Sequence, residues 1–150
     1  MLTFDGEDEL YKIAEINEKL PEDKKLQLVL RISTDDKKSV CSFSNKFGCP
    51  VADATQLLDV AKSLNLEVIG VSFHVGSGCG DEGAYSTAFD HATKLFQYAD
   101  KIGMTPMSLI DIGGGFPGNK GGSPGPNMPS FQKIAATVRS SIATFKQTVN

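Results

Sequence analysis

The chain has 150 residues, the size of one ordinary domain, and 40% of them are hydrophobic. Its net charge is −3 and its basic residues form no cluster, which excludes nucleic acid as a partner. No apolar run approaches the roughly 18–20 residues of a membrane span, and the acidic N-terminus is unlike a signal peptide, so no membrane association is expected. Cys41, Cys49 and Cys79 have no C-x-x-C spacing, which indicates reduced thiols in a cytoplasmic protein and no metal site.

The first half of the chain predicts two strands, each followed by a helix. Leu2–Phe4 is predicted as the tail of a strand. Asp5 is the expected N-cap of a helix whose apolar residues recur at helical spacing until Pro21 ends it. Leu26–Ile32 is a predicted strand, and Val51–Leu64 is a predicted helix with its leucines on one face.

The second half continues the alternation. Leu66–Phe73 is a predicted strand, Ala84–Ile102 a helix and Ser108–Ile112 a short strand. The stretch Asn119–Pro129 is rich in glycine, proline and serine, and it is expected to be an irregular insertion within one domain. Ser130 is the expected cap of a last helix.

This order of elements predicts a single α/β domain over residues 1–150. Strands that alternate with helices of this length form right-handed βαβ units and a parallel sheet. Periodicity leaves two architectures open, an open doubly wound sheet and a slice of an eight-fold barrel. Both bind their ligand at the carboxyl ends of the strands.

Two glycine-rich loops follow two of the predicted strands. The first is His74–Gly78 and the second is Gly113–Gly118. Glycine allows a backbone to approach a ligand closely and to offer its N–H groups to an anion. A plain turn needs one glycine, so three in succession favour a phosphate or another anion over a turn alone. Neither loop has the Rossmann or Walker A pattern, so a nucleotide fits poorly.

In the first loop, Ser77 offers a hydroxyl and an N–H to a phosphate. His74 is then expected beside the ring that carries the phosphate, where its imidazole stacks on that ring or donates a proton. The alternative is a histidine that is simply satisfied at the rim of the core.

Five further positions near the loops carry chemistry or structure. Arg31 is either a cation at the same strand ends or an edge arginine. Asp111 is expected to have a structural role, accepting hydrogen bonds from N–H groups of the second loop. Cys79 is expected to be an inert thiol near the site. Asp35 and Asp36 are expected to be solvated loop carboxylates.

Taken together, these stretches are similar to one family of enzymes. The resemblance begins at Thr3-Phe4-Asp5, and it continues through Leu30–Asp36, Lys46–Gly48, Gly70–Cys79 and Leu109–Gly118. All of them resemble the eukaryotic-type ornithine decarboxylases, which are pyridoxal-phosphate enzymes built on an alanine-racemase-like barrel. The resemblance implies a partial TIM (β/α)8 barrel.

The resemblance also implies roles for single residues. His74 is similar to the residue that stacks on pyridoxal 5′-phosphate, and Arg31 to the arginine close to that cofactor. Lys46 resembles a residue that pairs with the partner subunit of a homodimer. The implied phosphate cradle consists of Ser77, Gly113, Gly114 and Gly115. The implied reaction converts ornithine to putrescine and carbon dioxide, a step of polyamine biosynthesis.

Some family motifs are not found in these 150 residues. They include the cofactor-bearing lysine, the Glu-Pro-Gly-Arg stretch and the C-terminal β domain. We therefore expect a middle slice of the barrel with no catalytic residue of its own, which does not decarboxylate ornithine alone. Two alternatives remain open. One is a non-catalytic protein that resembles antizyme inhibitor and binds an antizyme-like regulator. The other is a decarboxylase of the same fold acting on another basic amino acid.

Overall fold

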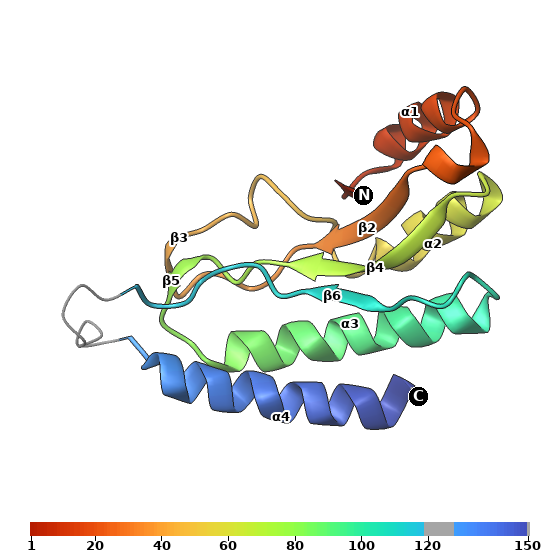
Figure 1. The fold of residues 1–150 in the computed structure, drawn as a ribbon. Helices are drawn as coiled ribbons and strands as arrows, with labels where there is room; N and C mark the ends of the chain where they lie inside the picture. Colours follow the sequence, from red (N-terminus) through yellow and green to blue (C-terminus); the bar gives the residue numbers. More distant parts are fainter. Residues whose placement is uncertain (119–127, 150) are drawn as a thin grey trace.

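The computed structural model describes residues 1–118 and 128–149 (Figure 1). Four parallel strands form the main sheet in the order β1-β2-β4-β6. They are β1 (Leu2–Phe4), β2 (Gln27–Ile32), β4 (Glu67–Phe73) and β6 (Leu109–Asp111). Two short strands, β3 (Ser39–Cys41) and β5 (Ser77–Cys79), form a separate antiparallel pair that lies beyond the carboxyl ends of the sheet strands (Figure 1).

The helices pack against one another in chain order. They are α1 (Glu7–Asn17), α2 (Ala54–Ser63), α3 (Gly83–Lys101) and α4 (Phe131–Val149), with a short 3-10 turn, η1, at Glu22–Lys24. Helix α1 contacts α2, α2 contacts α3, and α3 contacts α4. Helices α3 and α4 run side by side in the same direction (Figure 1), and the rings of Phe96 and Phe145 join them at 4.9 Å. None of the helices in the described ranges is long and apolar enough to cross a membrane.

The core lies on one face of the sheet. One face of each central strand is buried against the helices, with Leu28, Leu30 and Ile32 of β2 opposite Val68, Val71 and Phe73 of β4. The helices contribute Leu10, Ile13, Leu57, Leu58, Phe89 and Ile134, among others, to the same cluster. A doubly wound sheet carries helices on both faces, whereas a barrel carries them outside only. Successive helices on one face therefore identify a partial (β/α)8 barrel.

The pairing of β2 with β4 contains a one-residue irregularity. Leu28 pairs with Val68, but Val29 pairs with Gly70, so Ile69 is an extra residue in β4. A Cβ at Gly70 would overlap the backbone carbonyl of Leu109 in the neighbouring strand. This position therefore requires glycine for the close approach of the two strands.

All four predicted sheet strands are confirmed, with boundaries within two residues. The last helix begins as predicted, because Ser130 Oγ accepts a hydrogen bond from the Lys133 N–H at 3.3 Å. Two predictions at α1 are wrong. Gly6 is the N-cap, because the Asp5 carboxylate instead accepts the Gly48 N–H at 2.7 Å. The helix also ends at Asn17, before Pro21, where the Asn17 side chain turns inward to accept the Leu26 N–H.

Strands β3 and β5 were not predicted. Most of the predicted insertion, residues 119–127, lies outside the described residues. Cys49 and Cys79 are buried, Cys41 is exposed, and all three thiols are free.

Candidate functional site

The two glycine loops meet at the carboxyl ends of β4 and β6. The Cys79 N–H donates a hydrogen bond to the carbonyl of Gly115 at 3.3 Å. A Cβ at Gly115 would lie 2.6 Å from Val75 Cγ2 and 2.8 Å from the carbonyl oxygen of Gly76. Gly115 also has a φ of +100°, which side chains rarely adopt. Two loops some 40 residues apart in the sequence thus pack directly against each other, as the sequence predicted.

The imidazole of His74 is fixed at the junction of the loops. Its Nδ1 accepts the N–H of Gly76 at 3.0 Å, which leaves the proton of the neutral ring on Nε2. A Cβ at Gly114 would lie 2.7 Å from that Nε2. The ring of Phe43 meets the imidazole edge-on, with centroids 5.1 Å apart. The ring is therefore held from three directions.

The electrostatic surroundings favour a neutral His74. Partial burial lowers the pKa of its imidazole, and the positive charge of Arg31 lowers it further. The carboxylates of Asp111 and Asp36 act in the opposite direction but do not reverse the shift. At neutral pH the ring is uncharged, with its Nε2–H on the side of Gly114.

Asp111 organises the start of the second loop. Its Oδ1 accepts the N–H of Gly113 at 2.9 Å, and its Oδ2 accepts the hydroxyl of Ser72 at 3.0 Å. The predicted structural role of Asp111 is confirmed. The N–H of Gly113 is consequently engaged within the protein. No hydrogen bond among the described residues uses the N–H of Gly114 or Gly115.

Arg31 lies on the sheet face that the helices leave uncovered. It pairs in register with Ser72, which pairs with Asp111, so the three form a polar row across β2, β4 and β6 near their carboxyl ends. The guanidinium lies over the ring of Phe47, 5.0 Å from its centroid. Both groups line a cavity of about 440 Å³ that also includes Asp5. Arg31 is thus near the carboxyl end of β2, where the sequence left open either a cation of the site or an edge arginine.

Ser77 and Lys46 are both exposed. Ser77 opens β5, next to the point where the loops meet, and its hydroxyl makes no hydrogen bond to any described residue. Lys46 lies in the turn after Ser44, where its N–H donates to the carbonyl of Phe43. Cys79 is near the site and buried, and burial raises the pKa of its thiol, which agrees with the predicted inert thiol.

Sequence reasoning missed Tyr85, which supports the second loop. Its hydroxyl donates to the carbonyl of Gly114 at 3.0 Å, and its ring lies 5.3 Å from that of Phe116. The side chain is fully buried, and burial raises the pKa of the phenol, so it remains a neutral donor. Its signal in the sequence was an aromatic residue in the first turn of the helix after a glycine loop.

The prediction for Asp36 is wrong, whereas the one for its neighbour is confirmed. Asp35 is exposed, but the Asp36 side chain is enclosed by residues 42–44. Burial alone would raise the pKa of this carboxyl, but hydrogen bonds from Ser42 and Ser44 outweigh burial and hold the pKa far below its usual range. Asp36 is therefore a charged group inside the protein.

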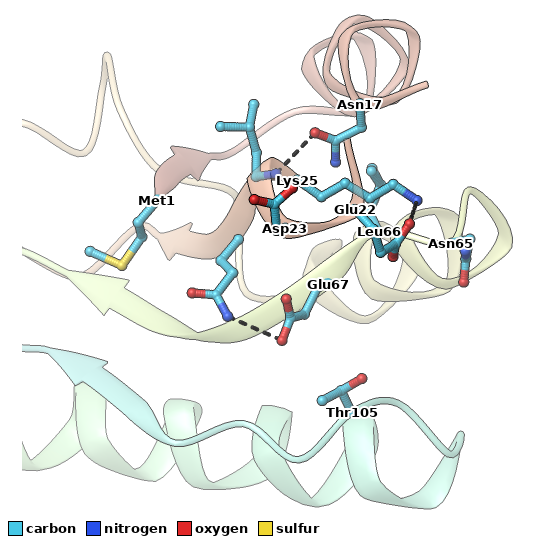
Figure 2. Close-up of a pocket in the computed structure, with 11 residues that line it drawn as sticks. Met1, Asn17, Glu22, Asp23, Lys25, Asn65, Leu66, Glu67 and Thr105 are labelled. Carbon is cyan, nitrogen blue, oxygen red and sulfur yellow. Dashed lines mark hydrogen bonds and ion pairs between the residues drawn. The ribbon is translucent and has the colours of Figure 1, made fainter. Parts of the chain in front are cut away.

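A cavity of about 540 Å³ lies at the opposite end of the sheet, around the amino ends of β2 and β4 (Figure 2). Four of its polar side chains pair with one another: Gln27 donates to Glu67 at 3.2 Å, and Lys25 pairs with Glu22 at 2.6 Å. The amino ends of barrel strands commonly serve stability and not catalysis. The candidate site is therefore the junction of the glycine loops.

Comparison with known proteins agrees with this geometry. The family described as "Pyridoxal-dependent decarboxylase, pyridoxal binding domain" matches residues 1–150. Ornithine decarboxylase of Mus musculus is 49% identical over 120 residues, covering 80% of this chain and 24% of the relative. Antizyme inhibitor 2 of Xenopus laevis is 48% identical over 120 residues, covering 80% of this chain and 25% of that relative. The chain thus spans about a quarter of the length of these relatives.

A solved structure shares the fold. The arginine decarboxylase of Paramecium bursaria Chlorella virus, bound to agmatine, superposes with a TM-score of 0.80 at 32% identity. The match covers 96% of this chain and 36% of that one.

Proposed function

Because the chain belongs to the family of pyridoxal-dependent decarboxylases, we propose that its glycine loops form part of the cofactor site of an ornithine decarboxylase. Pyridoxal phosphate is the cofactor of this family. The observation that carries the proposal is the junction of the two loops, where Gly114 and Gly115 have N–H groups that no described residue engages. A phosphate dianion is the natural acceptor for such a pair of donors.

The residues at the junction fit the cofactor in chemistry. The N–H groups of Gly114 and Gly115 and the hydroxyl of Ser77 would bind the phosphate. Gly113 allows the second loop to pack closely against β4, because a Cβ there would overlap the carbonyl of Phe73. The neutral ring of His74 would lie against the pyridine ring, where a charged imidazolium would oppose a protonated ring nitrogen.

Arg31 supplies positive charge near the same strand ends. When bound, the cofactor supplies the electron sink for loss of the substrate carboxylate as carbon dioxide. The contribution of these 150 residues is to hold and orient that group. The groups that carry out the proton transfers are assigned to no residue of this chain.

A titration tests the cofactor site. The protein is titrated with pyridoxal phosphate, and binding is followed by absorbance and by the ³¹P resonance of the phosphate. Binding by the wild type, weakened at least ~10-fold by Ser77→Ala, supports the proposal, because one hydrogen bond to a charged group is lost. Equal binding by both proteins, or no binding by either, contradicts it.

Ornithine is proposed as the substrate because several curated ornithine decarboxylases match this chain at 40–49% identity. The product would be putrescine. The test measures release of labelled carbon dioxide from carboxyl-labelled ornithine, lysine, arginine and diaminopimelate by the holoenzyme. A preference for one of the other three would favour a decarboxylase of the same fold with a different substrate.

A second candidate function is an antizyme-inhibitor-like interaction protein, since that relative is as similar as the decarboxylases. The retained loop geometry and His74 favour the enzyme, because a chain without cofactor chemistry does not require them. One observation, the absorbance band of bound cofactor, distinguishes the two functions. A protein purified from its natural source with a bound-cofactor absorbance band supports the enzyme. A protein without that band that binds an antizyme-like regulator supports the second candidate.

We also infer a cytoplasmic homodimer with Lys46 at its interface. Support comes from the family resemblance and from the exposed position of Lys46. Replacing Lys46 with alanine should weaken the dimer in sedimentation experiments, whereas Lys12→Ala, a change at an exposed lysine of α1, should not.

A further inference from the structure

Asp36 is a buried carboxylate that the proposed function leaves unused. It is 2% exposed, and it accepts the hydroxyls of Ser42 and Ser44 at 2.6 Å each. The N–H groups of Phe43 and Ser44 donate to it at 2.5 and 2.9 Å. None of the ion pairs among the described residues includes Asp36. Four neutral donors therefore hold its charge, and they fold residues 42–44 around it.

The segment that Asp36 organises lies against the first glycine loop. We call residues 34–44 the buttress segment. Its strand β3 pairs with β5, so that Ser39 faces Cys79 and Cys41 faces Ser77. The hydroxyl of Ser39 donates to the Asp36 carbonyl at 2.6 Å, and a Cβ at Gly76 would overlap the Ser39 side chain. The backbone of the loop thus rests directly on the buttress segment.

The same segment contacts His74 at two points. The hydroxyl of Thr34 donates to the His74 carbonyl at 2.8 Å. The ring of Phe43, whose own N–H is bound by Asp36, meets the imidazole edge-on. The carboxylate thus fixes the residue that touches the imidazole ring, without touching that ring itself.

We propose that Asp36 is a positioning residue that holds the buttress segment, and through it the His74 ring and the first glycine loop, in the geometry that receives the cofactor. Only the reception of the cofactor rests on the proposed function; the positioning of His74 and the loop does not. The asparagine variant is the informative change, because its amide keeps the shape but presents N–H groups to donors that need an acceptor. Asp35→Asn is a matched control, since Asp35 is exposed and its nearest cation, Lys37, is 4.0 Å away.

The first measurement uses no cofactor. Histidine ring resonances are followed by NMR against pH in the wild type, Asp36→Asn and Asp35→Asn, with His74→Asn and His91→Asn variants to assign the signals. The charges that act on His74 are Arg31, Asp111 and Asp36. Asp36→Asn should move the His74 resonances and lower the pKa of His74, while the His91 resonances stay where they are. Asp35→Asn should move the resonances of neither histidine.

The second measurement is the dissociation constant of pyridoxal phosphate for the same proteins. Asp36→Asn should raise it about tenfold, and Asp35→Asn should leave it unchanged. If Asp36→Asn does not fold, Ser44→Ala replaces it, because that change removes one donor and keeps the carboxylate charge. With Ser44→Ala, the His74 resonances should move without a loss of the neighbouring charge.

Unchanged His74 resonances in Asp36→Asn would overturn the proposal, as would an unchanged dissociation constant in a protein that binds the cofactor. A wild type that binds no pyridoxal phosphate would contradict the proposed function alone. In that case, the NMR comparison still decides whether Asp36 holds His74.

Discussion

The hydrogen bond from the Gly76 N–H to Nδ1 of His74 makes the site sensitive to a single proton. The bond requires Nδ1 to be unprotonated, so protonation of the imidazole breaks it. Burial, and then the charge of Arg31, lower the pKa of this ring in the folded chain. At the scale of the residue, the first loop is therefore stable in its observed form while His74 is neutral.

This sets a pH dependence for stability. Because the folded pKa of His74 lies below its ordinary value of 6.5, the contribution of the neutral ring is complete above that pH. It is lost as the pH falls through the lowered pKa. The free energy of unfolding in urea should decline over this range in the wild type and in His91→Asn, but less steeply in His74→Asn. Equal slopes in all three proteins would contradict the assignment.

Gly114 tests the fit of the second loop against the imidazole. A methyl group at this position would lie 2.7 Å from His74 Nε2, closer than real contacts allow, so Gly114→Ala must displace the ring. We expect the affinity for pyridoxal phosphate to fall by at least ~10-fold. Gly118→Ala is the control, since a Cβ there meets nothing within 4 Å. Equal affinities in the two variants would count against the proposed cradle.

The sequence predicted some single-residue roles and not others. Asp111 was interpreted correctly because the N–H that it accepts is two residues away in the chain. Asp36 was not, because its donors come from residues 42–44, a stretch without apolar periodicity. Asp5 was expected to cap its own helix, but a backbone N–H 43 residues away bound its carboxylate instead. Hydrogen bonds between residues close in the chain can be predicted from sequence, whereas donors that come from distant residues cannot.

At the scale of the elements, apolar periodicity predicted every strand of the main sheet and the four α-helices of the described residues. Strands β3 and β5 escaped prediction because they are three residues long and contain serine, glycine and exposed Val40 in place of alternating apolar residues. Their pairing depends on contacts between segments about 40 residues apart. The strand ends of the site were therefore predicted, whereas the buttress segment was not.

Helix α3 and the second loop are joined by one buried hydrogen bond, which offers a test of how the elements support each other. Tyr85→Phe removes the hydroxyl that donates to Gly114 and leaves that carbonyl without its partner. We expect the free energy of unfolding to fall by about 1 kcal/mol. Tyr11→Phe is the matched control, because this exposed tyrosine only donates to Glu7 within α1. Equal losses in both variants would contradict a supporting role for Tyr85.

At the scale of the whole molecule, the described residues form an open part of a barrel. Strands β1 and β6 lie at the edges of the sheet, and one sheet face carries no helix. Open edges and uncovered faces favour association between chains. The 150-residue chain by itself should therefore self-associate in ultracentrifugation. With pyridoxal phosphate and ornithine it should release no carbon dioxide. Turnover near ~1–10³ s⁻¹ would contradict this expectation.

The irregular pairing at Ile69 decides which side chains point into the barrel. Successive strand residues face opposite sides, so one additional residue inverts the parity of all those that follow. Ser72 stands beside Arg31 and Asp111 because the irregularity leaves Ile69 without a partner; a regular pairing onward from Leu28 and Val68 would place Val71 opposite Arg31. If β4 instead alternated regularly through Ile69, the ring of Phe73 would point toward the interior and the Ser72 hydroxyl toward the apolar core beneath the helices. The irregular pairing at Ile69 thus determines which side chains of β4 line the inside of the barrel.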